Sequence, residues 1–427
     1  MSVVRDLRVL LRLTNFRRLL AVRLLSQCAD GVYQVALATY VVFSPEKQTS
    51  AAAIASAMAI LLLPYSLVGP FAGVLLDRWQ RRQVFLYGNL LRALLACGTA
   101  VLVLASVPDW LFYASALSVT AVNRFVLAGL SASLPRVVDD ERLVVANSLS
   151  PTAGTLAATL GGGLAFGVQL LADNSNAAVV AAGAVLYLAA ALASLRMSRE
   201  LLGPDPDDEP QPLTSALAST ARGLAAGLRH LAERRPAARA LAAVTLMRFC
   251  YGALFVTVLM LCRYAWSATE SEGLGLLGLA VATSGAGFFA AAVLSPWAVG
   301  RFGPFGWMTL CAAAAAVLEP ALGLTFAPTP FLVAAFVLGL TTQGGKIATD
   351  TVVQTSVDDA YRGRVFALYD VLFNVAFVSA AGVAALMLPP DGRSALLIVL
   401  VAVIYAGIAL ALRRGERTER CGERTEG

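Results

Sequence analysis

The stretch GVLLDRWQRR, residues 73–82, places one aspartate and three arginines between two long apolar segments, 51–72 and 84–106. Similar apolar segments recur along all 427 residues, of which 58% are hydrophobic and 14% are charged. Soluble globular proteins carry about 25% charged residues. In a helix, about 20 apolar residues cross a hydrocarbon core of about 30 Å. The composition therefore indicates a polytopic membrane protein.

The apolar pattern predicts an all-α protein with twelve membrane-spanning helices. Alanine, glycine and leucine dominate the apolar segments, which is typical of closely packed helices and not of barrel strands. The first segment lacks a small-residue cleavage site after it, so we expect it to be a retained helix and not a signal peptide. The predicted spans are 19–43, 51–72, 84–106, 110–134, 146–171, 177–196, 238–262, 273–299, 305–326, 330–353, 364–388 and 394–412.

Basic residues predict the orientation of these spans. Only Lys47, Arg263 and Arg393 fall on one set of loops, and the other basic residues outside the spans lie on the opposite set and in the tails. Because positive charge stays on the cytoplasmic side, both termini are expected in the cytoplasm of a multi-pass protein of the cell (inner) membrane. The net charge of +6 is then explained by this rule and by anionic lipids, without nucleic acid.

The chain is organised as six spans, a linker and six further spans. We expect an N-terminal six-helix bundle at 1–196, a cytoplasmic linker at 197–237, a C-terminal six-helix bundle at 238–412 and a basic cytoplasmic tail at 413–427. The linker begins with the acidic, proline-rich LLGPDPDDEPQPLT, which predicts irregular structure. Next comes SALASTARGLAAGLRHLAERR, whose apolar spacing predicts an amphipathic helix, either on the membrane surface or as a soluble connector.

A repeat relates the two halves. PRVVDDERLVV (135–145) follows the fourth span and TSVDDAYRGRVF (355–366) follows the tenth. Both give Val-Asp-Asp, a nearby arginine and then a new apolar segment. Parallel repeats of this kind are typical of transporters that move two halves around a shared site.

With these features the chain resembles the major facilitator superfamily. The loop of that family between its second and third helices reads Gly-x-Leu-x-Asp-Arg-x-Gly-Arg-Lys/Arg. The gating residues that match are Gly73, Asp77, Arg78, Arg81 and Arg82, together with Leu75, while Gln80 replaces the glycine. The second-half copy, PWAVGRFGPFG, keeps Arg301 and Gly303 but has Gly300 where the aspartate would stand. The resemblance implies two pseudo-symmetric six-helix bundles.

Two further stretches resemble the bacterial drug, macrolide and siderophore proton antiporters, the enterobactin-exporter-like group. LLSQCADGVYQVAL in the first span is similar to their Ser-x-x-Gly-Asp pattern, with Ala29 in place of the glycine. NRFVLAGLSASLPRVVDDERLVVAN (123–147) follows their fourth span and its loop. The fifth span, GTLAATLGGGLAFG, lacks the Gly-Pro pair of the exporter signature. Its glycines serve close helix packing.

The gating loop suggests a latch. In the family the aspartate of this loop faces the N-terminus of helix eleven, which is predicted to begin near Arg364. Its arginines then pair with acidic residues of the next cytoplasmic loop, for which Asp139, Asp140 and Glu141 are the latch partners expected here. A simpler interpretation is that Arg78, Arg81 and Arg82 only follow the positive-inside rule.

Charges inside the spans are candidates for proton coupling. Each costs roughly 2.5–3.5 kcal/mol at the bilayer centre, so retention without a role is unexpected. The resemblance implies that spans one, four and seven line a central cavity, which suits Asp30, Arg124 and Arg248. We hypothesise that Asp30 carries the proton with Arg124 as its switching partner; a fixed structural ion pair is the alternative. Glu319-Pro320 interrupts span nine and is either a second proton site or packed against a kink.

Other polar and aromatic side chains in the spans are weaker candidates. Lys346 and Asp350 are four residues apart and are expected to neutralise each other. Arg92 is expected to reach the headgroups or to pair locally. Asp370 and Asn374 lie one turn apart and are candidates for lining the inner vestibule. For the remaining possible substrate contacts, helix packing is nearly as good an explanation. They are Gln27, Tyr33, Gln34, Asn123, Tyr251 and Phe255.

The sequence thus predicts a secondary active transporter and not an enzyme, since we find no enzyme motif in it. It also has no phosphate-binding loop with a lysine, so we do not expect ATP-driven transport by this chain alone. The single histidine, His230, and six scattered cysteines exclude a histidine relay and give no metal spacing. We expect a monomer in the bilayer without a cofactor. It is expected to export an amphipathic small molecule (a drug, macrolide or siderophore) and to use the proton gradient as its energy source. A lysolipid flippase or solute importer of the same fold is the nearest alternative. A non-transporting membrane sensor or assembly protein is the alternative from another class.

Overall fold

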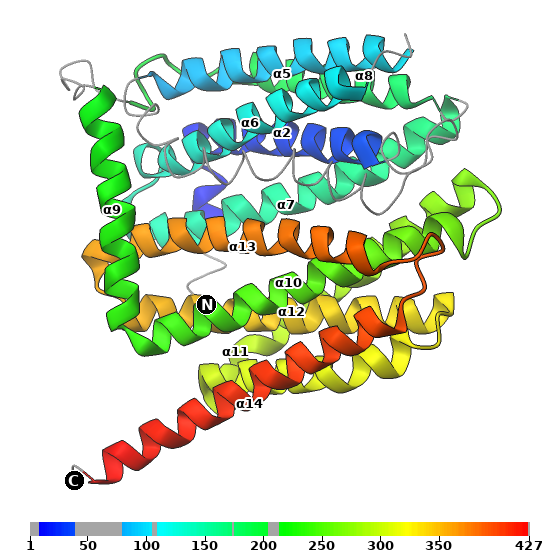
Figure 1. Ribbon diagram of the computed structural model, residues 1–427. Helices are drawn as coiled ribbons and strands as arrows, with labels where there is room; N and C mark the ends of the chain where they lie inside the picture. The colour runs from blue at the N-terminus through cyan, green and yellow to red at the C-terminus, as the bar shows by residue number, and fades with distance from the viewer. Residues whose placement is uncertain (1–7, 39–78, 105–108, 173–174, 204–212, 426–427) are drawn as a thin grey trace. The chain divides into compact units, whose positions relative to one another are not determined.

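The computed structural model describes residues 8–38, 79–104, 109–172, 175–203 and 213–425. Within these ranges the chain forms helices and no strand (Figure 1). The expected second span, 51–72, lies outside them. The helices are α2 Thr14–Ala38, α5 Arg81–Leu104, α6 Asp109–Ala132, η3 Leu134–Arg136, α7 Asp140–Leu171, α8 Asn176–Ser194, α9 Leu213–Glu233, α10 Arg235–Tyr264, α11 Glu270–Gly323, α12 Pro328–Ser356, α13 Asp359–Met387 and α14 Ala395–Thr425.

Each predicted membrane span corresponds to a helix wherever the structure describes it. Nine helical stretches in the described ranges are long and apolar enough to cross a bilayer. Helix α2 is not among them, because Arg23, Asp30 and two glutamines make it more polar. It nevertheless covers the predicted first span as far as Ala38, where the described residues end.

Helix α11 contains two predicted spans, 273–299 and 305–326, with no loop between them. The helix is kinked at Gly303, whose φ of 74° and ψ of 166° are non-helical. Only glycine adopts this backbone conformation readily, and Pro304 then begins the second half with a φ that suits a helix. A single glycine therefore replaces a loop. The interruption expected at Pro320 is wrong, because the helix continues to Gly323 and Pro320 falls within its last turn.

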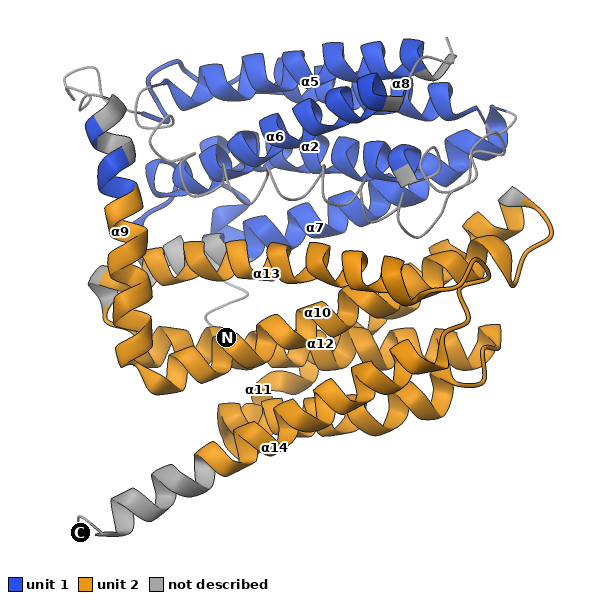
Figure 2. Ribbon diagram, in the orientation of Figure 1, with its two compact units in different colours: residues 1–41, 67–220 blue, residues 42–66, 221–427 orange. Residues whose placement is uncertain are grey.

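The described residues form two compact units, which divide between Thr220 and Ala221 inside α9 (Figure 2). In unit 1, α2 packs on α7 and α8, and α5 packs on α6 and α8. Glycines allow the α2–α7 contact: a Cβ on Gly31 would collide with the carbonyl of Ala158, and one on Gly161 with the carbonyl of Cys28. The glycine-rich segment of α7 therefore serves close packing, as predicted.

Unit 2 is built on the same rule. Helix α10 packs on α12 and α13, and α11 packs on α12 and α14. A Cβ on Gly287 of α11 would collide with the carbonyl of Phe336, and one on Gly339 of α12 with the carbonyl of Ser284. Backbones that approach this closely gain van der Waals contact, which replaces the hydrophobic drive that lipid cannot supply.

The amphipathic helix predicted in the linker is α9, and its second half packs on unit 2. Gly223 and Gly227 leave room for the side chain of Arg364 on α13. His230 stacks on Tyr361 with 4.4 Å between the ring centroids. Arg234 donates two hydrogen bonds to Asp358, at 2.8 and 2.9 Å. The apolar side of α9 therefore covers the N-terminal end of α13.

The Val-Asp-Asp repeat occupies equivalent positions in the two units. Asp139 is the N-cap residue of α7 and Asp358 is the N-cap residue of α13, and both have extended backbone angles. Aspartate is favoured at this position because a carboxylate complements the free amides and positive end of a helix. The repeat is thus a pair of matching helix starts.

Candidate functional site

Unit 1 holds a buried polar network centred on Arg92 of α5. Its guanidinium donates to Oδ1 of Asp30 at 2.9 Å and to Oδ1 of Asn123 at 2.9 Å. It also donates to Oγ of Ser26 at 2.6 Å and to the side chain of Asn89. The helical period brings these groups together, since Ser26 and Asp30 lie one turn apart on α2, and Asn89 and Arg92 nearly one turn apart on α5. Arg92 is 0% exposed.

Tyr187 of α8 completes the network. Its hydroxyl donates to Oδ1 of Asp30 at 2.8 Å, and its ring centroid lies 4.5 Å from Cζ of Arg92. The carboxylate of Asp30 therefore receives an arginine and a tyrosine hydroxyl in a site that is 6% exposed. A buried ion pair needs such additional hydrogen bonds to offset its desolvation.

This geometry corrects one expectation and decides between two others. The cation that pairs with Asp30 is Arg92, where we expected Arg124. Of the two alternatives for Arg92, the structure shows local pairing and not reach to the headgroups, because the side chain points into the core of unit 1. The physical reason is helix twist: Asn123 faces the network, and the next residue on α6 points about 100° away. The spacing of Asn89 and Arg92 on one face of the third span was the sequence signal for this site.

Unit 2 presents its buried charges differently. The Cζ atom of Arg248 on α10 lies 4.4 Å from the ring centroids of Phe373 and Phe377 and 5.1 Å from that of Tyr251. We call these three rings the aromatic cage. Nε of Arg248 is buried and has no hydrogen-bond partner among the described residues. The cation is therefore stabilised by the ring faces and not by a carboxylate.

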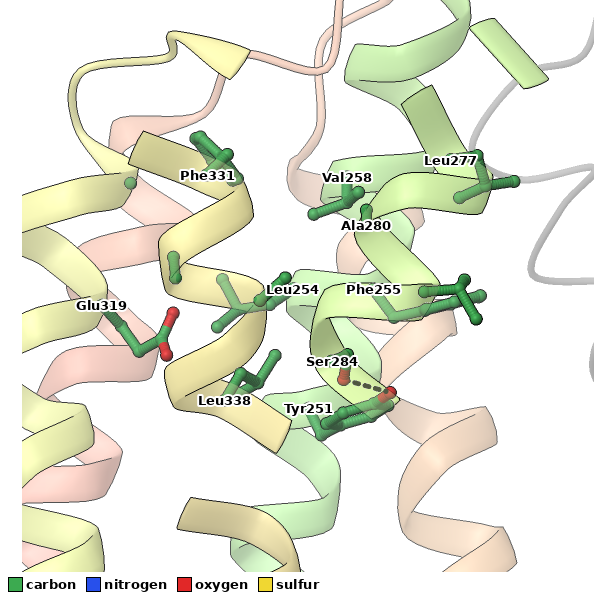
Figure 3. Close-up of a pocket in the computed structure, with 14 residues that line it drawn as sticks. Tyr251, Leu254, Phe255, Val258, Leu277, Ala280, Ser284, Glu319, Phe331 and Leu338 are labelled. Atoms are coloured by element: carbon green, nitrogen blue, oxygen red, sulfur yellow. Dashed lines mark hydrogen bonds between the residues drawn. The ribbon is translucent and has the colours of Figure 1, made fainter. Parts of the chain in front are cut away.

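Glu319 of α11 is the second isolated charge of unit 2. It is 3% exposed, and its Oε1 has no hydrogen-bond partner in the described part of the chain. Its carboxyl group borders a cavity of about 40 Å³ between α10, α11 and α12 (Figure 3). That volume is sufficient for water. The cavity is lined by Tyr251, Leu254, Phe255, Val258, Leu277, Ala280, Val281, Ser284, Glu319, Gly323, Phe331, Ala334, Ala335 and Leu338.

Tyr251 connects the two features of unit 2. Its ring is part of the aromatic cage and also lines the cavity. Its hydroxyl lies 3.3 Å from Oγ of Ser284, as Figure 3 shows. Phe255, the other aromatic residue predicted as a substrate contact in this span, lines the same cavity. The structure therefore brings Tyr251, Phe255 and Glu319 together.

The pair predicted between Lys346 and Asp350 is confirmed. Nζ of Lys346 donates to Oδ2 of Asp350 at 2.8 Å and lies 5.5 Å from the ring centroid of Tyr369. Oδ1 of Asp350 and the buried hydroxyl of Tyr369 have no hydrogen-bond partner among the residues described. Unit 2 thus contains several buried polar atoms whose bonding capacity is unused.

The remaining candidates have separate surroundings. Tyr33 is buried and its hydroxyl pairs with Oγ1 of Thr99 at 3.1 Å, so it belongs to helix packing. Gln27 lies over Gly154. Gln34 and Asp370 are exposed, Arg124 is partly buried, and Asn374 donates to the carbonyl of Asp370 at 3.0 Å.

The gating loop is described only in part. Gly73, Asp77 and Arg78 lie outside the described residues. The guanidinium of Arg81 donates to the carbonyls of Ala132 at 2.9 Å and Leu202 at 3.1 Å, which ties the end of α6 to the segment after α8.

The other residues of the predicted latch stay predictions. Nε of Arg82 is buried without a partner among the described residues. Asp139 is exposed, and nothing is described of the side chains of Asp140 and Glu141. Arg364, predicted near the start of helix eleven, lies in the first two turns of α13 with its Cζ 5.3 Å from the ring of Tyr361.

Comparison with known proteins gives three findings. The sequence model of the Major Facilitator Superfamily matches residues 19–318. Uncharacterized MFS-type transporters of Mycobacterium bovis and Mycobacterium tuberculosis are each 36% identical over 409 residues, covering 95% of this chain and 92% of theirs.

Solved transporter structures share the fold. A nucleoside transporter, NupG, superposes with a TM-score of 0.66 at 16% identity and covers 93% of this chain and 98% of its own. A peptide transporter, POT, gives a TM-score of 0.67 at 14% identity, with 92% and 93% covered. At this level of identity the likeness concerns the fold alone.

Proposed function

Because the chain belongs to the major facilitator superfamily, and is therefore a multi-pass membrane transporter of small molecules and not an enzyme, we propose that it is a proton-coupled exporter of amphipathic organic compounds. The proposal has two parts, the proton and the substrate. Residues in unit 2 support both, because they border the same cavity.

Glu319 carries the proposal. A buried carboxylate without a partner is costly in a bilayer, whereas the protonated acid can donate a hydrogen bond to water in the adjoining cavity. The side chain therefore takes up a proton when it is buried and releases it when the transport cycle hydrates the cavity. Asp30 is less suited to this task, because Arg92 and Tyr187 already hold its charged form.

The substrate class follows from the lining of the cavity. Tyr251, Phe255 and Phe331 supply aromatic surface, and most of the other side chains are aliphatic. At about 40 Å³ the cavity holds water and not a substrate. Mostly apolar walls with a few polar groups would suit a drug-like, macrolide-like or siderophore-like molecule once the transport cycle widens the cavity. The direction of transport rests on the resemblance of the first span and of residues 123–147 to exporters.

Two alternatives remain distinguishable. An importer of the same fold would move its substrate into the cell, so loss of the protein would lower accumulation. A lysolipid flippase would move lipid between the leaflets, so its loss would alter lipid asymmetry. A sensor or assembly protein would move nothing. Accumulation of labelled compounds with and without an uncoupler separates these outcomes, because only a proton-coupled exporter shows uncoupler-sensitive extrusion.

The test of the proton site uses the full chain in proteoliposomes with a pH-sensitive dye inside. Substrates are first chosen from a sensitivity panel of drugs, macrolides and siderophores on a deletion strain. Substrate addition should move protons for the wild type and for Glu319→Asp, but not for Glu319→Gln, which cannot carry one. Glu272→Gln, at the exposed start of the same helix, is the matched control. Proton flux that persists in Glu319→Gln would contradict this assignment.

A further inference from the structure

Several buried polar atoms of unit 2 lack hydrogen-bond partners among the described residues, and three of them lie on packed helices α10, α12 and α13. These three are Nε of Arg248 on α10, Oδ1 of Asp350 on α12 and the hydroxyl of Tyr369 on α13. In native structures nearly all buried polar groups are satisfied by protein or by water. The ring of Tyr369 lies 5.6 Å from the ring of Phe373, which covers Arg248, and 5.5 Å from Nζ of Lys346, the partner of Asp350. One local region of a single unit therefore has both unused donors and an unused acceptor.

Arg248 is the unusual member of this group. It lies 13 residues after the start of the 30-residue helix α10, which places it near the middle of a membrane span. A guanidinium stays charged in proteins, so burial cannot be relieved by losing a proton. The aromatic cage covers faces of the group through cation–π contacts. Ring faces accept no conventional hydrogen bond from its N–H edges, which stay available to an anion.

Comparison with Arg92 shows what a purely structural arginine looks like in this protein. Arg92 donates to four side chains, one of them a carboxylate, and is fully enclosed. Arg248 is half-buried, and its contacts among the described residues are with aromatic rings. Nε lacks an acceptor in both arginines. The terminal nitrogens of Arg92, however, have four side-chain acceptors, whereas the guanidinium of Arg248 has none among the described residues.

We infer that Arg248 is the anion-recognition residue of the substrate site, and that the transported compounds are amphipathic organic anions: a carboxylate, sulfonate or phosphate on an aromatic or aliphatic body. This inference rests on the proposed transport function and specifies its substrate class. The guanidinium N–H groups bind the anionic group in a two-pronged arrangement. Tyr251 joins the aromatic cage to the cavity, so the apolar body lies along Tyr251 and Phe255.

The neighbouring charges are compatible with an anion at Arg248. The carboxylate of Asp350 is paired with Nζ of Lys346 at 2.8 Å. Asp370 is exposed. The hydroxyl of Tyr369 can donate a further hydrogen bond to the anion. Glu319 lines the cavity from α11 and has no hydrogen bond to Arg248.

The experiment measures binding of three probes that share one aromatic body. Dansylglycine is anionic, dansylamide is neutral and dansylcadaverine is cationic. The full-length protein is reconstituted in nanodiscs of neutral lipid, and dansyl fluorescence is titrated at a fixed pH without a gradient, with empty nanodiscs subtracted. The wild type should bind dansylglycine at least about tenfold more tightly than either other probe.

Substitutions then assign the preference to Arg248. Arg248→Gln should remove the preference for dansylglycine while binding of dansylamide changes less than about twofold, and Arg248→Lys should keep part of it. Arg263→Gln, which removes the same charge in the last turn of α10, is the matched control. This variant should bind the probes as the wild type does. Unfolding temperatures establish that each variant is folded. If Arg248→Gln does not fold, Arg248→Lys is used for the test.

Two results would overturn the inference: equal affinity of the wild type for the three probes, or a preserved anion preference in Arg248→Gln. Competition identifies the source of the anion. Displacement of dansylglycine by naphthoate indicates a soluble organic anion, and displacement by lysophosphatidate alone indicates a lipid headgroup. Because no gradient is applied, loss of proton coupling in Glu319→Gln would leave these binding results unchanged, so the two proposals can fail separately.

Discussion

The two units treat buried charge in opposite ways. In unit 1, Asp30 and Arg92 form an ion pair that gains further hydrogen bonds from Asn123 and Tyr187, and of the donors of Arg92 only Nε is left without a partner among the described residues. In unit 2, Arg248 is surrounded by rings and Glu319 borders a cavity without a hydrogen bond to a described residue. A satisfied pair resists change, because every rearrangement breaks several interactions at once.

The difference leads us to propose a division of labour. In this proposal the charges of unit 1 fix the packing of α2, α5, α6 and α8, and those of unit 2 are completed by a proton or a substrate. Since an isolated intramembrane charge costs about 2.5–3.5 kcal/mol on insertion scales, unit 2 gives up stability that unit 1 does not. Four substitutions test this contrast.

The largest effect is expected for Asp30→Leu, which leaves Arg92 buried without its carboxylate. Breaking one side of a buried pair costs about 3–5 kcal/mol, so the thermal unfolding temperature in detergent should fall sharply. The double variant Asp30→Leu/Arg92→Met should recover most of the loss, because neither charge is then left unpaired. A single variant as stable as the wild type would show that unit 1 does not depend on this pair.

A smaller loss is expected for Tyr187→Phe, which removes one hydroxyl and keeps the ring over Arg92. Hydrogen bonds to charged groups contribute about 1.5–3 kcal/mol. Chemical denaturation of the purified protein measures the change. Tyr33→Phe is the control for losing a buried hydroxyl that bonds only neutral groups, and it should cost less. Equal losses in the two variants would argue that the charge of Asp30 is not what Tyr187 stabilises.

In unit 2, Arg248→Met should change stability by less than about 1 kcal/mol, because no carboxylate is left behind and the methionine side chain can fill the aromatic cage. The same denaturation experiment applies, with Arg92→Met as the reference. If Arg248→Met is as destabilising as Arg92→Met, then the contrast between the units is false and Arg248 is structural.

The smallest effect is expected at the exposed pair of Arg234 and Asp358, whose side chains are 45% and 55% exposed. Exposed ion pairs contribute about 0.2–1 kcal/mol and are screened by salt. Arg234→Gln should therefore lower stability slightly at low ionic strength and not at about 0.5 M salt. The buried pair in unit 1 should show much less salt dependence, which unfolding at the two ionic strengths can measure.

Most of the helices could be predicted because span length and apolar composition are local properties. Every predicted span in the described residues has a corresponding helix, and so does the amphipathic helix predicted in the linker. The repeat at Asp139 and Asp358 was also visible, because helix starts are encoded by adjacent residues. The pairing of charges could not be predicted, because Asp30 and Arg92 are 62 positions apart and meet only after three helices have packed.

The sequence by itself determined that this chain is an all-helical membrane protein with two related halves and ionisable residues within its spans. A bilayer allows few other arrangements for segments of this length and composition. Only the tertiary structure decided which of those residues are satisfied. Whether a charged side chain meets a carboxylate, a ring or a cavity depends on the rotation and contact of neighbouring helices, and small residues such as Gly31 and Gly161 set that contact.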